Sequence, residues 1–263
     1  MKVSLMLVLV LLLYLVSSIG HLYVMLTDRR KLFTFILICL ISGFVIHGIL
    51  LASSLSLFQS KGVGFWFSGI SWVILLFYLL LYAKYKEIAF GGFAVPVAFI
   101  IEGYASTFPG VLGGGSSEIE GYLLKGHAYL AVLGMAAFFL LMFTSIMYII
   151  QSSQLKSRRP GAWLHRLPSL NVLDNLGHKI LYFGFAFLTF SLLLGSMWAR
   201  SKHGTFWSLD PLSLVRTWPL AFTWLAYGLL LVCRITRSWK GMRSAIFSMF
   251  CFVCVIFSLL SHF

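Results

Sequence analysis

Apolar residues gather in eight long runs, separated by short segments that hold most of the charged side chains. A membrane-spanning helix needs about 20 mostly apolar residues. The runs of suitable length are residues 2–20, 32–52, 65–83, 88–103, 126–151, 176–198, 216–233 and 244–262. No small-x-small cleavage site follows the first run, so we interpret it as a span rather than a signal peptide. The pattern predicts an all-α fold, a polytopic transmembrane helical bundle of about eight spans that forms a single integral membrane domain over residues 1–263.

Composition supports a membrane protein and changes the interpretation of the charge. The chain is 60% hydrophobic and 10% charged, with a mean hydropathy of +0.96, outside the range of soluble domains. A formal net charge of +13 could indicate a nucleic-acid partner. The basic residues instead punctuate the apolar runs, as topology signals do. We therefore expect no nucleic acid binding.

Lysine and arginine are shared unequally between the two sets of connecting segments. One set holds 14 of the 20: Arg29, Arg30, Lys31, Lys84, Lys86, Lys156, Arg158, Arg159, Arg166, Lys179, Arg234, Arg237, Lys240 and Arg243. The others are Lys2, Lys61, Lys125, Arg200, Lys202 and Arg216. The positive-inside rule places the richer set in the cytoplasm. This predicts a multi-pass protein of the cell inner (cytoplasmic) membrane with the N-terminus and C-terminus both outside.

The segment Trp198–Pro211 lies between the sixth and seventh runs and is predicted to be a short external loop. It contains the compact sequence Trp207-Ser208-Leu209-Asp210-Pro211. Aromatic rings offer flat apolar surface, and polar groups among them can hold the edge of a large planar ligand. Tryptophan also collects at membrane interfaces for general reasons, which is the alternative for any single ring here.

The cysteines give little indication of chemistry. Cys251 and Cys254 form a CxxC pattern, but they lie inside the last apolar run without a second cysteine pair. Buried small side chains are the favoured interpretation. The chain also contains no CxxCH motif, so it is not itself a c-type cytochrome.

Topology sorts the seven histidines. His127 begins the fifth run and His262 ends the eighth, both at the predicted external face, and His203 lies in the external loop. Two histidines from different helices at one membrane depth can bind one iron axially; chance placement at helix ends is the alternative. His21, His165 and His178 fall at cytoplasmic ends, where an interfacial polar role is favoured.

His47 differs because it lies well inside the second run, in the predicted outer half of the bilayer. An ionisable residue at that depth is costly and indicates function by default. Two interpretations stay open: a ligand role, and a neutral imidazole with a hydrogen-bond partner.

From Leu173 onward the chain carries several motifs in a fixed order. They are Leu173-Asp174, Leu194-Gly195-Ser196-Met197-Trp198-Ala199, His203-Gly204-Thr205-Phe206-Trp207-Ser208-Leu209-Asp210-Pro211, Trp224-Leu225-Ala226-Tyr227, Ser238-Trp239-Lys240-Gly241 and Leu260-Ser261-His262-Phe263. Upstream, Gly126-His127 opens the fifth run. Together they resemble the cytochrome c assembly proteins of the CcsA/ResC type, within the haem-handling group that includes CcmC and HemX. The motifs cover about residues 120–263, and the first 100 residues are similar only in hydropathy.

The resemblance implies a haem-binding membrane protein of cytochrome c biogenesis that presents haem at the outer face for attachment to apocytochrome c. It implies haem b as cofactor, with His127 and His262 as axial ligands of the haem iron. Trp207, Asp210 and Trp198 would help to hold the haem, and His47 would be an intramembrane ligand. It also implies a CcsB/ResB-like membrane partner and a possible role as a component of haem ligation, similar to a cytochrome c haem lyase.

The chain also departs from the family pattern. His203 and Leu209 stand where the family has tryptophans, and Val232-Cys233-Arg234 occupies the region where a second intramembrane histidine is expected. One alternative is therefore a HemX-like membrane protein that regulates haem biosynthesis without ligation activity. An unrelated transporter is a further alternative. It would be expected to show an internal repeat and charged residues at mid-membrane.

Overall fold

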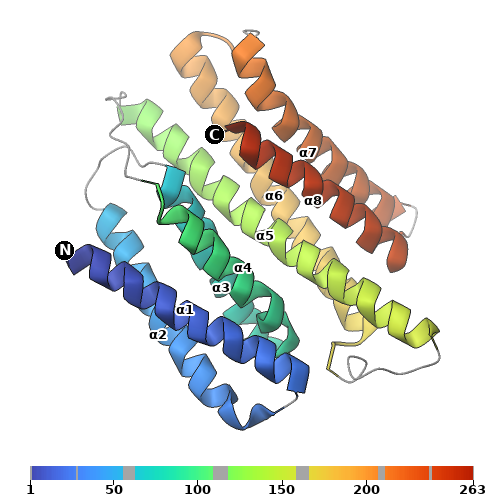
Figure 1. Ribbon diagram of the computed structural model, residues 1–263. Helices are drawn as coiled ribbons and strands as arrows, with labels where there is room; N and C mark the ends of the chain where they lie inside the picture. Colours follow the sequence, from blue (N-terminus) through green and yellow to red (C-terminus); the bar gives the residue numbers. More distant parts are fainter. Residues whose placement is uncertain are drawn as a thin grey trace. The chain divides into compact units, whose positions relative to one another are not determined.

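The computed structural model describes residues 2–27, 29–55, 63–108, 118–157, 166–206, 211–236 and 239–262. The helices are α1 (Lys2–Thr27), α2 (Phe33–Leu55), α3 (Val63–Tyr85), α4 (Ala89–Ala105), α5 (Glu118–Lys156), α6 (Leu170–His203), α7 (Pro211–Thr236) and α8 (Met242–His262), with a short 3₁₀ helix η1 (Arg30–Leu32) (Figure 1). No strand occurs in these ranges. The predicted all-α class and the eight helices are confirmed, and the chain divides into two compact units.

The first unit, Met1–Gly114 with His165–Leu167, contains α1 to α4. Helix α1 packs on α2 and α4, and α3 packs on α4 and α2, so the four helices surround a common core. Tyr14 and Tyr78 lie fully buried in it. The Arg166 guanidinium donates to the carbonyl oxygens of Met25 and Leu26. These carbonyls have no partner within the helix, since they lie at the C-terminal end of α1.

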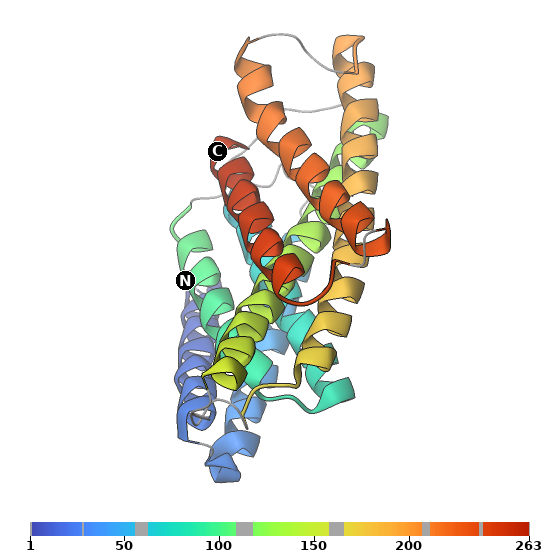
Figure 2. The same ribbon diagram turned by 90° about the vertical axis from the view of Figure 1, so that its right-hand side faces the viewer.

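The second unit, Gly115–Leu164 with Pro168–Phe263, contains α5 to α8. Helices α5 and α6 run antiparallel in close contact, and α7 and α8 form a second antiparallel pair (Figure 2). A Cβ added at Gly134 would lie 3.4 Å from the Leu188 backbone nitrogen, so this glycine lets the backbones of α5 and α6 approach. Small residues serve this purpose where helices pack in membranes. Between α5 and α7, the Phe138 and Tyr227 rings stack at 3.8 Å.

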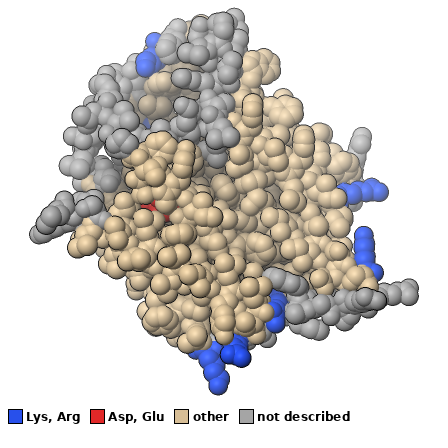
Figure 3. All heavy atoms as spheres, in the orientation of Figure 1, with Lys and Arg blue, Asp and Glu red and all other residues tan. Residues whose placement is uncertain are grey.

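The surface fits a protein that crosses a membrane several times. Six of the described helices are long and apolar enough to span a bilayer, and α4 and α8 are shorter apolar helices. One face of the molecule shows uncharged residues over most of its described area, with lysine and arginine at the margins (Figure 3). Charged side chains avoid hydrocarbon because burying an unpaired charge is costly, so this distribution is typical of a lipid-facing surface.

The predicted external loop Trp198–Pro211 was wrong in part. Trp198 does not belong to a loop, because α6 continues to His203 and ends where Gly204 adopts φ 75°. The segment after Met197 contains alanine, arginine and lysine, which favour helix, and the left-handed glycine ends it. The predicted run 88–103 corresponds to α4, and the predicted run 126–151 lies inside the longer α5. Glu102 lies within α4 and α5 begins at Glu118, since a helix can continue beyond its apolar run.

Candidate functional site

His127 is held by the neighbouring helix α6. Its Nδ1 lies 2.7 Å from the Ser191 carbonyl oxygen, and the Ser191 hydroxyl donates to the His127 carbonyl oxygen at 2.9 Å. A carbonyl oxygen only accepts, so Nδ1 must carry the proton of the neutral imidazole. The lone pair is then on Nε2. A backbone carbonyl on one ring nitrogen is the usual way to fix the tautomer of a metal-binding histidine.

The Nε2 atom of His127 has no hydrogen-bond partner among the described residues. The Nδ1–Cε1 side of the ring packs against Gly195, where an added Cβ would lie 2.8 Å from Nδ1 and 3.0 Å from Cε1. A side chain at position 195 would therefore displace the imidazole. The motif residues Gly126-His127 and Gly195 thus meet in space, and the free lone pair suits axial ligation of a haem iron.

Trp198 lies one turn beyond Gly195 on α6 and is half-buried. The Lys202 ammonium lies 5.1 Å from the centre of its ring, within the range of a cation–π interaction. Arg200 contacts a different ring, with its guanidinium 4.5 Å from the centre of Phe206. The tryptophan predicted to hold the ligand is therefore on the same helix as the residues that hold His127.

The other predicted residues of this site are not placed. Trp207 and Asp210 lie outside the described residues. His203 and His262 end α6 and α8, but their side chains are not described. The pairing of His127 with His262 on one iron therefore stays a prediction.

His47 belongs to the first unit and has polar partners at both ring nitrogens. The Tyr14 hydroxyl lies 3.0 Å from Nδ1, while Nε2 lies 2.7 Å from the Ser68 hydroxyl and 3.3 Å from the Glu102 carboxylate. Ser68 in turn donates to Glu102 at 3.2 Å. Nε2 therefore donates and Nδ1 accepts from Tyr14. Binding of an iron by His47 would require one of these partners to leave.

Glu102 is a buried carboxylate that was not identified from the sequence as a candidate site residue. It is 2% exposed and paired with His47, which is 1% exposed. It lies inside the predicted run 88–103. A useful signal was available: the uncharged Gly103-Tyr104-Ala105 extends the helical segment beyond it. His21, predicted to be interfacial, is also buried and lies 2.9 Å from the Tyr78 hydroxyl.

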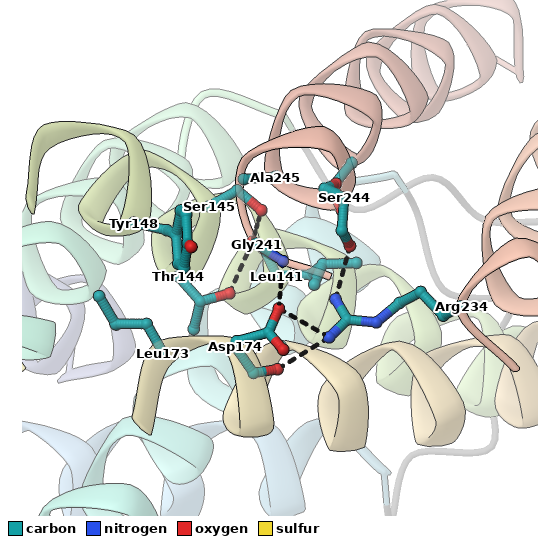
Figure 4. A pocket seen from close by; sticks show the side chains of 12 residues that line it. Leu141, Thr144, Ser145, Tyr148, Leu173, Asp174, Arg234, Gly241, Ser244 and Ala245 are labelled. Carbon is teal, nitrogen blue, oxygen red and sulfur yellow. Dashed lines mark hydrogen bonds and ion pairs between the residues drawn. The ribbon is translucent and has the colours of Figure 1, made fainter. Parts of the chain in front are cut away.

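A third polar group, the Asp174 cluster, consists of Asp174, Arg234, Gly241 and Ser244 (Figure 4). Arg234 donates to the Asp174 carboxylate at 2.9 Å and to the Ser244 hydroxyl at 2.5 Å. The Gly241 N–H also donates to the Asp174 carboxylate, at 2.9 Å. The cluster joins α6, α7 and α8, and brings together the Leu-Asp and Trp-x-Gly motifs. It lines a small pocket between these helices and α5.

Comparison with known proteins identifies the family. The family model described as Cytochrome C assembly protein matches residues 3–262. The chain belongs to this family. The resemblance of the motifs is thus confirmed, and the match extends over the first 100 residues, where the motifs gave only hydropathy.

Individual relatives carry the name cytochrome c biogenesis protein CcsA. The chain is 41% identical over 90 residues to that of Porphyra purpurea, covering 34% of this chain and 27% of the relative. For Guillardia theta the identity is 43% over 86 residues, covering 33% and 27%. For Trieres chinensis it is 27% over 208 residues, covering 67% and 65%. The matches thus span less than two thirds of each of these family members.

Proposed function

We propose that this multi-pass membrane protein binds haem b at the outer membrane face and presents it for attachment to apocytochrome c. The observation that carries the proposal is the state of His127: Nδ1 is tied to the Ser191 carbonyl at 2.7 Å, which leaves the Nε2 lone pair for iron. Family membership supports a role in cytochrome c assembly. The predicted topology places the external ends of α5, α6 and α8 on one side of the membrane.

The other ligands and contacts follow the family resemblance. His262, at the end of α8, would supply the second axial nitrogen, and Trp198, Trp207 and Asp210 would support the haem. The haem supplies the vinyl groups that the thiols of an apocytochrome CxxCH motif attack, so the protein itself contributes binding and orientation. The cytochrome must afterwards remove the haem, which requires axial bonds that exchange. A CcsB/ResB-like membrane partner would complete this ligation component.

A second candidate is a HemX-like protein that regulates haem biosynthesis without ligation. The substitutions His203 and Leu209, where the family pattern has tryptophans, favour it. The two candidates differ in one product. Only the ligation component attaches haem covalently to an apocytochrome that carries CxxCH. As a control, an apocytochrome whose two cysteines are replaced by serine should acquire no covalent haem.

The first experiment is the absorption spectrum of the detergent-purified protein. We expect a low-spin Soret band that is lost in His127→Ala and in His262→Ala, and that returns in His127→Gly when imidazole is added. His203→Ala is the matched control and should retain the band. Loss of the band in His203→Ala alone would show that the ligand assignment is wrong. A haem-free wild-type protein that takes up no added haem would exclude the proposal.

A further inference from the structure

One face of α6 carries Ser191, Gly195, Trp198 and Lys202. Successive residues of an α-helix turn by about 100°. These four positions therefore lie within an arc of about 60° around the axis. The side-chain contacts agree with this placement: Ser191 and Gly195 touch the His127 imidazole, and Lys202 lies over Trp198. The face thus leads from the predicted iron ligand, past an aromatic ring, to a cation.

The order of these groups corresponds to the chemistry of haem. Haem is an apolar macrocycle with two ionised propionate carboxylates on one edge and its vinyl groups elsewhere on the ring. The helical rise of about 1.5 Å per residue puts Lys202 about 10 Å along the axis from Gly195, against which His127 packs. A lysine ammonium offers three N–H donors to a carboxylate. The Trp198 ring lies 5.1 Å from this ammonium and holds it on the face of α6 that contacts His127.

We propose that Lys202, positioned by Trp198, recognises a propionate carboxylate of the bound haem. This inference rests on the proposed function and adds an orientation to it: the propionate edge faces the Lys202 end of α6. The vinyl edge, which reacts with the thiols, then points away from the Lys202 ammonium. Lys202 is a specificity residue for ligands with a free carboxylate, whereas His127 binds the iron.

Arg200 provides a matched control within the same turn of helix. It is also exposed and has the same charge, but it lies about 180° around α6 from Ser191 and contacts Phe206. A general attraction between basic residues and an anionic ligand would involve both side chains alike. A specific propionate contact would involve Lys202 and not Arg200.

The test is a binding titration in detergent with two probes, haem and its dimethyl ester, in which both propionates are uncharged. An exposed ion pair contributes up to about 1 kcal/mol, so Lys202→Gln should weaken haem binding about two- to fivefold. The same variant should bind the ester as the wild type does. Arg200→Gln should bind both probes unchanged. Lys202→Glu should weaken haem binding more than Lys202→Gln does.

The outcomes separate this inference from the function on which it rests. Equal losses in Lys202→Gln and Arg200→Gln would overturn the propionate contact, as would a Lys202→Gln defect that persists with the ester. In either case, binding that still depends on His127 would leave the proposed function intact. Failure of the wild type to bind either probe would exclude the proposed function itself.

Discussion

At the scale of single residues, His127 and His47 are both histidines within helices but differ in what their nitrogens can do. His127 has one nitrogen fixed by the Ser191 carbonyl and the other without a described hydrogen-bond partner. His47 has Tyr14 on one nitrogen, and Ser68 and Glu102 on the other. The lone pair required by a metal is therefore available in the first imidazole and occupied in the second.

Gly195→Ala should disturb iron ligation, because the new Cβ would lie 2.8 Å from Nδ1 of His127. We expect a shift of the Soret band toward the high-spin position, and a changed histidine signal in ¹⁵N NMR of the haem-free protein. Gly126→Ala is the control. Its Cβ would meet the flexible end of Leu194 at 2.9 Å, which can move aside. A normal spectrum for Gly195→Ala would contradict the proposed packing.

His47→Ala should lower the free energy of unfolding and should leave haem binding intact. The substitution removes the Nε2–H that faces the Glu102 carboxylate and the acceptor of the Tyr14 hydroxyl, and leaving a buried polar group without its partner costs about 1–3 kcal/mol. Thermal unfolding in detergent should show the loss, while the Soret band per folded protein stays constant. Glu102→Gln should be milder, since its amide oxygen can still accept from Ser68. A lost haem signal with unchanged stability would instead support the intramembrane ligand role.

At the scale of helices, the Asp174 cluster fixes how three of them meet. The carboxylate of α6 accepts from Arg234 at the end of α7 and from the turn before α8. Gly241 has φ 69°, and a Cβ there would lie 2.6 Å from the Tyr148 hydroxyl, so the turn requires glycine. The cluster therefore positions the start of α8, the helix that ends at His262.

Arg234→Leu should destabilise the second unit by about 3–5 kcal/mol, because it leaves a partly buried carboxylate without its cation. The double variant Asp174→Leu/Arg234→Leu should lose less than the sum of the two single variants, since no unpaired charge remains. Thermal unfolding of all three variants measures the coupling. Arg243→Leu, at an exposed position of α8, should be nearly neutral. Additive losses would show that the pair does not act as a unit.

At the scale of the whole molecule, the proposed function depends on which side of the membrane the site faces. The basic residues predict that both termini are outside. A reporter enzyme that folds only in an oxidising compartment should be active when fused after Phe263. The same reporter fused in the turn between α7 and α8 should be inactive. The reverse pattern would place His127 and His262 on the cytoplasmic side and exclude haem presentation at the outer face.

The amino-acid sequence was enough to predict the helices, the membrane setting and the family. The thickness of the bilayer sets the length of an apolar run, and the motifs lie in an order that can be recognised without coordinates. It also selected His127, Trp198 and His47. It misplaced Trp198, because an apolar run marks the hydrocarbon and not the end of a helix, and it overlooked the pairing of Glu102 with His47.

Which polar groups meet could not be predicted from the sequence, because it depends on how the helices pack. Ser191 is 64 residues from His127, and Arg234 is 60 residues from Asp174. The pattern within one helix shows which side is apolar, but not which atom of another helix faces a given side chain. That choice comes from the packing of helices, in which a buried polar group must find a partner. The tautomer of His127 and the pairing of His47 with Glu102 follow from that packing alone.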